Sequence, residues 1–187
     1  MELRMLSTFQ DVVSRLDAIE VPYMVTGSFA MLVYVPARTT YDVDIVIELT
    51  EDNADRFVQA FVRDYYIEEK SVRRAIERRS LFNIISLSTS FKVDCIIRKD
   101  TLLEKEKFGR RVRAEVEGIG FWTITAEDLI LSKLTWARES LSERQFQDIR
   151  ALLESGVDET VIRVRAEQEE LSGVRLEYER WKTRVKN

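Results

Sequence analysis

The segment that most constrains the fold is residues 41–49, YDVDIVIEL, which is rich in β-branched residues and alternates in polarity at its start. This pattern predicts a β-strand, because successive side chains of a strand point to opposite faces. Asp42 and Asp44 would then share one face, and the apolar residues between and after them would share the other. Two neighbouring carboxylates repel each other, so we expect them to face water or a bridging cation.

A magnesium ion suits such a pair, because it is bound by one or two carboxylates together with water and substrate phosphate oxygens. The alternative is a solvent-facing strand that carries two surface acids, and for an Asp-x-Asp pattern alone we favour this alternative. The decision therefore depends on what else the sequence places near the two acids.

Three other features favour a ligand site. Gly27-Ser28 falls where a predicted strand turns into a predicted helix, and a glycine followed by a helix N-terminus can hold phosphate, although an ordinary Ser N-cap remains the alternative. Arg38 and the following Thr39 come just before the acids and could donate to phosphate. Asp94 lies in the predicted strand FKVDCIIR, where a third carboxylate could bind metal and accept a proton from an acceptor hydroxyl.

Composition excludes several other chemistries. The 187 residues include no histidine, which removes Ser-His-Asp and Cys-His nucleophiles and histidine zinc sites. Cys95 is the only cysteine, so intramolecular disulfides and thiolate zinc clusters are excluded as well. No run of about 18 apolar residues predicts a membrane span, and the start of the chain lacks the pattern of a signal peptide, so we expect a cytoplasmic protein.

Charge is distributed unevenly along the chain. Residues 70–113 contain 13 Lys and Arg against 5 Asp and Glu, a net charge of +8, whereas the remainder carries −12. The basic runs RRAIERR and KEKFGRRVR could attract phosphate, or they could be solvated helix and strand faces, which we favour for a charge run alone. The acidic total argues against strong non-specific binding of duplex DNA.

Periodicity predicts an α/β core over residues 1–124 and a helical C-terminal region over 125–187. In the core, the pattern predicts strands that form a hairpin at 81–88 and 91–99, a polar basic connection after them, and a turn at Gly118 and Gly120. In the C-terminal region, Thr125 is a predicted N-cap with Asp128 at the N3 position. Further helices are predicted at 143–153 and over 158–187, with a break at Gly173.

Taken in order, Gly27-Ser28, then Asp42-x-Asp44 after 13 intervening residues, then Asp94 in a later strand, resembles the polymerase-beta-like nucleotidyltransferase superfamily. The string GSFAMLVYVPARTTYDVDIVIEL is most similar to the abortive-infection type (AbiEii-like) of bacterial nucleotidyltransferase. A later block, residues 127–153, is also similar to that type and contains a helical Lys…Asp pattern. The resemblance implies an α/β (α+β) fold, with a nucleotidyltransferase-like mixed sheet flanked by helices and a helical C-terminal part.

The resemblance also implies roles for individual residues. Asp42, Asp44 and Asp94 would be the catalytic and metal-binding carboxylates, holding up to two Mg²⁺ ions. Lys133 would reach the triphosphate or orient Asp148, although a lysine that extends its amine to solvent is about as well supported. The nucleotide would be held by residues that could donate hydrogen bonds to phosphate: Gly27, Ser28, Arg38 and Thr39, with Lys133.

The leading hypothesis is therefore a metal-dependent enzyme that transfers NMP from an NTP, such as ATP, to a hydroxyl of a protein, an RNA or a small molecule. The alternative is a non-catalytic nucleotide-binding regulatory partner, such as one member of a toxin–antitoxin pair. The presence of all three acids favours catalysis. The charged helical segment 167–186, with interleaved apolar residues, favours the alternative, because it could be a partner-binding arm.

Overall fold

The computed structural model describes residues 3–36, 42–140, 142–168, 170 and 172–185. These residues form two compact units. The first unit contains the described residues up to Val33 and from Asp42 to Ile124, and the second contains Tyr34–Pro36 and the described residues from Thr125 onward.

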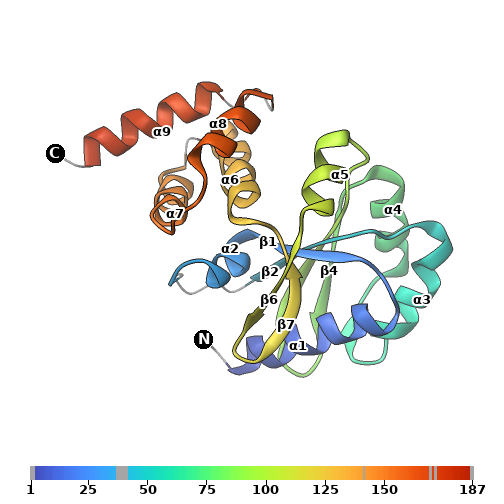
Figure 1. The fold of residues 1–187 in the computed structure, drawn as a ribbon. Helices are drawn as coiled ribbons and strands as arrows, with labels where there is room; N and C mark the ends of the chain where they lie inside the picture. Colours follow the sequence, from blue (N-terminus) through green and yellow to red (C-terminus); the bar gives the residue numbers. More distant parts are fainter. Residues whose placement is uncertain (1–2, 37–41, 141, 169, 171, 186–187) are drawn as a thin grey trace. The chain divides into compact units, whose positions relative to one another are not determined.

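The first unit is built on a mixed β-sheet (Figure 1). Its strands are β1 (Tyr23–Thr26), β2 (Asp42–Ile47), β3 (Tyr65–Tyr66), β4 (Leu81–Ser86), β5 (Lys92–Ile97), β6 (Val112–Val116) and β7 (Ile119–Thr123). The strand order is β3-β4-β5-β2-β1-β7-β6. The β2–β5 and β1–β7 pairs are parallel, and the other neighbouring pairs are antiparallel. This sheet, with its helices, confirms the predicted fold class.

One face of the sheet is apolar and buried. In-register partners share a face, and Phe82, Cys95, Ile45 and Val25 form one such row across β4, β5, β2 and β1. Each of these side chains is at most 3% exposed. Because burying one large apolar side chain contributes about 1.5–3 kcal/mol, rows of this kind supply much of the stability of the unit.

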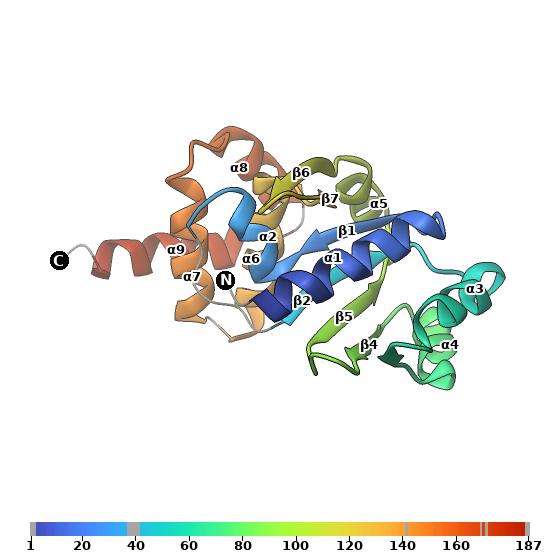
Figure 2. The ribbon, with the colours of Figure 1, turned by 90° about the horizontal axis from the view of Figure 1, so that it is seen from below.

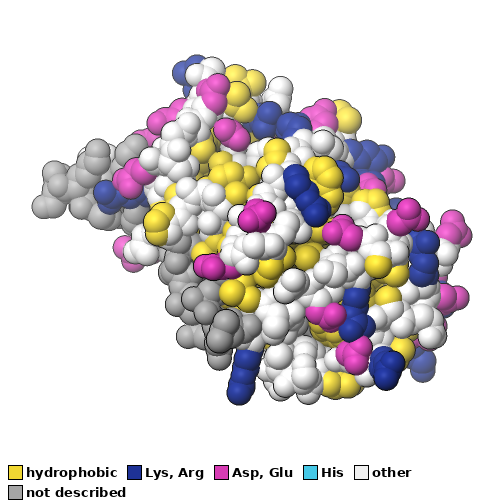
Figure 3. All heavy atoms as spheres, turned by 60° about the horizontal axis from the view of Figure 1, so that its bottom comes forward, with side chains coloured by type: hydrophobic (Ala, Val, Ile, Leu, Met, Phe, Trp, Pro, Cys, Tyr) yellow, Lys and Arg dark blue, Asp and Glu magenta, His cyan; other side chains and the backbone are white. Residues whose placement is uncertain are grey.

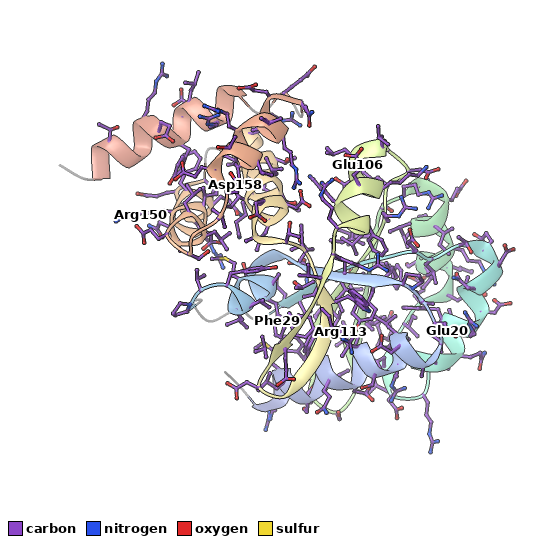
Figure 4. All side chains as sticks on the ribbon, in the orientation of Figure 1. Glu20, Phe29, Glu106, Arg113, Arg150 and Asp158 are labelled. Atoms are coloured by element: carbon purple, nitrogen blue, oxygen red, sulfur yellow. The ribbon has the colours of Figure 1, made fainter. Side chains whose placement is uncertain are left out.

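Helices cover this apolar face. The helical segments of the unit are α1 (Leu3–Ala18), α2 (Gly27–Ala30), the 3-10 turn η1 (Met31–Val33), α3 (Glu51–Phe61), α4 (Glu69–Arg78) and α5 (Leu102–Gly109). Phe9 of α1 contacts Phe121 of β7 edge to face at 4.8 Å, and Phe57 of α3 contacts Phe82 of β4 at 5.6 Å. Phe29 joins the first of these clusters where α2 meets the sheet (Figure 4). Figure 2 shows α1 lying along the sheet and α3 beside α4.

Local signals placed several of these elements and missed others. Thr50 and Asn53 form a capping box at the start of α3. The prediction of a polar, basic connection after the hairpin is wrong. That segment contains α5, whose Lys107 and Phe108 are buried. Periodicity missed this helix because it has few apolar residues and they do not recur at helical spacing. Gly120 lies within β7 rather than at the turn, which is made by Glu117 and Gly118, both with positive φ.

The second unit is helical. Its helices are α6 (Ala126–Ser140), α7 (Glu143–Leu153), α8 (Glu159–Gln168) and α9 (Ser172–Val185). The backbone amide of Asp128 donates to the Thr125 hydroxyl at 3.3 Å, which confirms the predicted N-cap of α6. Asp158, labelled in Figure 4, accepts from two backbone amides at the start of α8. Gly173 lies inside α9, so the predicted break at this position is wrong.

Several surface charges of the first unit are paired with neighbouring charges of opposite sign. Arg73 binds Glu51, Asp55 and Glu69 at 2.5–2.9 Å, and Lys105 binds Asp100 at 2.7 Å. Figure 3 shows the same mixture of basic and acidic side chains over one face of the molecule. Part of the basic excess in residues 70–113 is therefore compensated by acids elsewhere in the chain, such as Glu51 beside Arg73 and Glu48 beside Arg98. None of the described helices is both long enough and apolar enough to cross a membrane.

Candidate active site

The three aspartates predicted from the sequence lie on the face of the sheet opposite the apolar rows. Asp44 on β2 and Asp94 on β5 are direct partners in the parallel register, so their side chains stand next to each other. Asp42 lies two residues before Asp44 on the same face, opposite Lys92. All three aspartates are partly exposed. Asp44 and Asp94 are 50 positions apart in the sequence, and the pairing of β2 with β5 brings them side by side.

Gly27 lies directly against this acidic row. Thr26 is the register partner of Asp44, and the chain turns at Gly27 from β1 into α2. Gly27 has a φ of +65°, and a Cβ built there would lie 2.9 Å from Cγ of Asp44 and closer still to Oδ2. Glycine is required here on both counts, since other residues rarely adopt this φ and the carboxylate occupies the space. Ser28 follows in the first turn of α2 and is partly exposed.

Two further residues, which the sequence argument did not single out, hold Asp94. The Lys92 ammonium lies 2.9 Å from Oδ2 of Asp94, and the Asn83 amide donates to Oδ1. The pKa of Lys92 is raised, first by the hydrogen bond to Asp94 and then, against partial desolvation, by the negative charges of Asp94, Asp42 and Asp44. All three carboxylates thus act on one ammonium group. The signal for Lys92 was present in the sequence, because a residue two positions before Asp94 in a strand shares its face.

The carboxylate oxygens at this site are the kind of ligand that Mg²⁺ prefers. Asp44 and Asp94 provide adjacent carboxylates on a partly exposed face, and Mg²⁺ requires only one or two carboxylates when phosphate and water complete its shell. Within the described ranges, no group of three acidic or other metal-binding side chains surrounds a single point. The arrangement therefore suits an ion that arrives together with a phosphorylated substrate.

Lys133 lies in the second unit, on α6, and its amine binds Asp148 of α7 at 2.7 Å. Both side chains are 5% exposed, and Gln145 lies 3.5 Å from the same amine. Of the two interpretations left open by the sequence, an amine that extends to solvent is wrong, because this amine is buried against Asp148. A role for Lys133 toward nucleotide stays a prediction. Arg38 and Thr39 lie outside the described residues.

Comparison with known proteins agrees with this geometry. A sequence model of the aminoglycoside-2''-adenylyltransferase family matches residues 8–118. The solution structure of the antibiotic-resistance factor ANT(2'')-Ia aligns over 100% of this chain and 97% of its own, with a TM-score of 0.59 and 11% identity. The lincosamide adenylyltransferase LnuA aligns over 81% of this chain and 96% of its own, with a TM-score of 0.54 and 14% identity.

A third structure, an antigenic nucleotidyltransferase-like protein from Paracoccidioides brasiliensis, aligns over 83% of this chain and 77% of its own, with a TM-score of 0.52 and 15% identity. No curated protein sequence matches the chain at a significant level. At these identities the structures show the fold, which is that of a nucleotidyltransferase.

The family match and the fold together define the class, a nucleotidyltransferase of the polymerase-beta-like superfamily. Within this class, the chain belongs to the aminoglycoside-2''-adenylyltransferase family, and it is an enzyme. The narrower resemblance to the abortive-infection type is not shown by this match.

Proposed function

We propose that the protein transfers AMP from ATP to a hydroxyl of a small-molecule acceptor in a magnesium-dependent reaction. The observation that carries this proposal is the pairing of Asp44 with Asp94, with Gly27 packed against Asp44. Family membership supports adenylyl transfer. ANT(2'')-Ia has been solved with adenylyl-2''-tobramycin and LnuA with lincomycin, so small molecules occupy both of these structural neighbours.

Under this proposal, Asp42 and Asp44 would hold the metal and Asp94 would complete its site, together with the phosphate oxygens of the substrate. The metal would neutralise the triphosphate and the developing charge on the leaving pyrophosphate. Gly27 leaves room for the Asp44 carboxylate itself, because a Cβ at this position would overlap it. Ser28 would donate its hydroxyl to the phosphates, and Arg38, Thr39 and Lys133 are proposed as further phosphate-binding groups.

Asp94 is the proposed general base. The acceptor oxygen attacks the α-phosphorus, the bond from that phosphorus to the bridging α,β-oxygen breaks, and pyrophosphate leaves with the bonding electron pair. The acceptor hydroxyl proton passes to the Asp94 carboxylate. Lys92 and Asn83 hold this carboxylate through separate oxygens and so fix its position.

Transfer of radiolabel from ATP tests the proposal. The purified protein is incubated with Mg²⁺ and ATP labelled at the α-phosphate, together with either the low-molecular-weight or the macromolecular fraction of a cell extract. We expect labelled small molecules, and Asp94→Asn should reduce their formation by about 10²–10⁴-fold, the usual contribution of a general base. Asp52→Asn, on the exposed first turn of α3, is the matched control and should retain activity.

Other outcomes would change the assignment. Labelling of protein or RNA would favour the abortive-infection type of acceptor. Binding of Mg-ATP, measured as a rise in Tm, without any transfer would favour the regulatory partner. Equal activity of Asp94→Asn and Asp52→Asn would remove Asp94 from the chemistry.

A further inference from the structure

The two edges of the sheet differ in how well they are protected from pairing with another strand. At one edge, β3 is only two residues long, so it offers few backbone groups for pairing. At the other edge, β6 runs from Val112 to Val116 without proline or lysine and keeps a regular register with β7. Short strands, lysine, proline and bulges are features that keep sheet edges from pairing. The edge at β6 has none of these features.

The backbone of β6 presents hydrogen-bonding groups along its outer side. The turn that follows β6 has two residues, both with positive φ, so Val116 and Ile119 form the hydrogen-bonded pair that closes the hairpin. Bonded and non-bonded pairs alternate along an antiparallel ladder, so the N–H and C=O groups of Arg113 and Glu115 point away from β7. The 3-10 turn η1 contacts β6, but no backbone hydrogen bond joins Arg113 or Glu115 to a described segment outside the sheet.

The side chains of β6 are complementary to a second copy of the same strand. In an antiparallel pair centred on Ala114, Arg113 of one copy lies opposite Glu115 of the other, and the two-fold axis repeats this pair. Arg113 and Glu115 are also the residues whose backbone groups point outward, so charges and hydrogen bonds match in one register. On the other face of the strand, Val112, which is 40% exposed, comes opposite Val116.

Neither of the two charges is strongly paired within one copy. Glu115 is exposed and forms no ion pair with any residue that the structure describes. Arg113, labelled in Figure 4, is half exposed and lies 3.8 Å from Asp17. Its guanidinium is 5.7 Å from the centre of the Trp122 ring. Both side chains are therefore available to a charge of opposite sign across an interface.

We propose that the protein forms a homodimer in which β6 pairs antiparallel with β6 of a second copy. Backbone hydrogen bonds along the two edges would give affinity, and the Arg113–Glu115 pairs would set the register. The two sheets would then continue into each other across the two-fold axis. This inference is independent of the proposed function, because the carboxylate row lies on β2 and β5.

Sedimentation velocity at increasing protein concentration measures the dimer, and charge reversal tests its register. Arg113→Glu and Glu115→Arg should each raise the dimer Kd about tenfold or more, because each places like charges opposite each other at both symmetry-related positions. The double variant Arg113→Glu/Glu115→Arg should return the Kd to within about threefold of the wild-type value, because opposite charges again face each other.

Glu77→Arg is the matched control for the charge change. Glu77 is exposed on α4, which packs against β4 near the other edge of the sheet. This variant should leave the dimer Kd unchanged. An equal loss of dimer in Glu77→Arg and Glu115→Arg would show that net charge, rather than the β6 edge, controls association.

Hydrogen exchange identifies the strand itself. The amides of Arg113 and Glu115 should exchange quickly in dilute protein and slowly once the dimer forms. A protein that stays monomeric at every soluble concentration would overturn the inference, as would a dimer whose Kd does not respond to the single reversals or is not restored in the double variant. Slow exchange of these two amides in the monomer would also overturn it, because another segment of the same chain would then cover the edge.

Discussion

Two Lys–Asp ion pairs, one in each unit, have the same chemistry and different surroundings. Lys92 and Asp94 lie 2.9 Å apart on the sheet, with side chains 43% and 15% exposed. Lys133 and Asp148 lie 2.7 Å apart between two helices, and both side chains are 5% exposed. A partly exposed pair can exchange partners with ions and ligands at little cost, whereas a buried pair cannot lose one member without leaving a desolvated charge. Burial thus separates an exchangeable pair from a structural one.

The largest expected effect is on stability, at the buried pair. Lys133→Met should lower the free energy of unfolding by about 3–5 kcal/mol, because Asp148 stays buried without its partner. Urea denaturation measures this change. The double variant Lys133→Met/Asp148→Leu is the control and should recover much of the loss, since it removes both charges.

The same variants also test the proposed nucleotide role of Lys133. Mg-ATP binding is measured without urea, at a temperature where each variant is folded. If the double variant regains stability but not Mg-ATP binding, Lys133 contributes to the nucleotide site. A Lys133→Met protein as stable as the wild type would contradict the contrast between the two pairs.

An intermediate effect is expected at Gly27, beside the exposed pair. Gly27→Ala should destabilise the protein by about 1–3 kcal/mol through its positive φ alone, and its Cβ would also displace the Asp44 carboxylate. Mg-ATP should therefore raise Tm less in this variant. Thermal unfolding with and without Mg-ATP measures both effects.

Two other glycines separate strain from steric displacement. Gly118 has a positive φ, like Gly27, but open space where a Cβ would lie, and Gly109 has the same open space without a positive φ. We expect Gly118→Ala to lose stability and keep its response to Mg-ATP, and Gly109→Ala to keep both. A full Mg-ATP response in Gly27→Ala would show that the position of Asp44 is unimportant for nucleotide.

The smallest effect on stability is expected at Lys92. Lys92→Met should change the free energy of unfolding by about 1 kcal/mol or less, because the pair is partly exposed. It should also strengthen binding of Mg²⁺ alone, since the ammonium that all three carboxylates attract is gone. Denaturation and a Mg²⁺ titration followed by Tm measure the two quantities.

Lys105→Met is the matched control for Lys92, because it breaks an exposed pair with Asp100 away from the carboxylate row. It should leave Mg²⁺ binding unchanged. A loss of several kcal/mol in Lys92→Met would make its pair structural, like that of Lys133, and would remove the distinction between the two units.

The sequence by itself determined the properties that depend on neighbours along the chain. Alternation in residues 41–49 placed Asp42 and Asp44 on one face of a strand, which β2 confirms. The N-cap signal at Thr125 placed the start of α6, and the helix predicted at 143–153 is α7 with the same bounds. These signals are local because capping and side-chain periodicity act within one or two turns or strand residues.

Only the tertiary structure decided how the site is assembled. The strand order makes β2 and β5 parallel neighbours and so sets Asp44 beside Asp94. It also brings Gly27 against Asp44, and Asn83 against Asp94. No local pattern encodes these contacts, because strand order depends on how every helix and strand packs over one shared core. Local periodicity also missed α5, because its two buried residues, Lys107 and Phe108, form no amphipathic pattern along the chain.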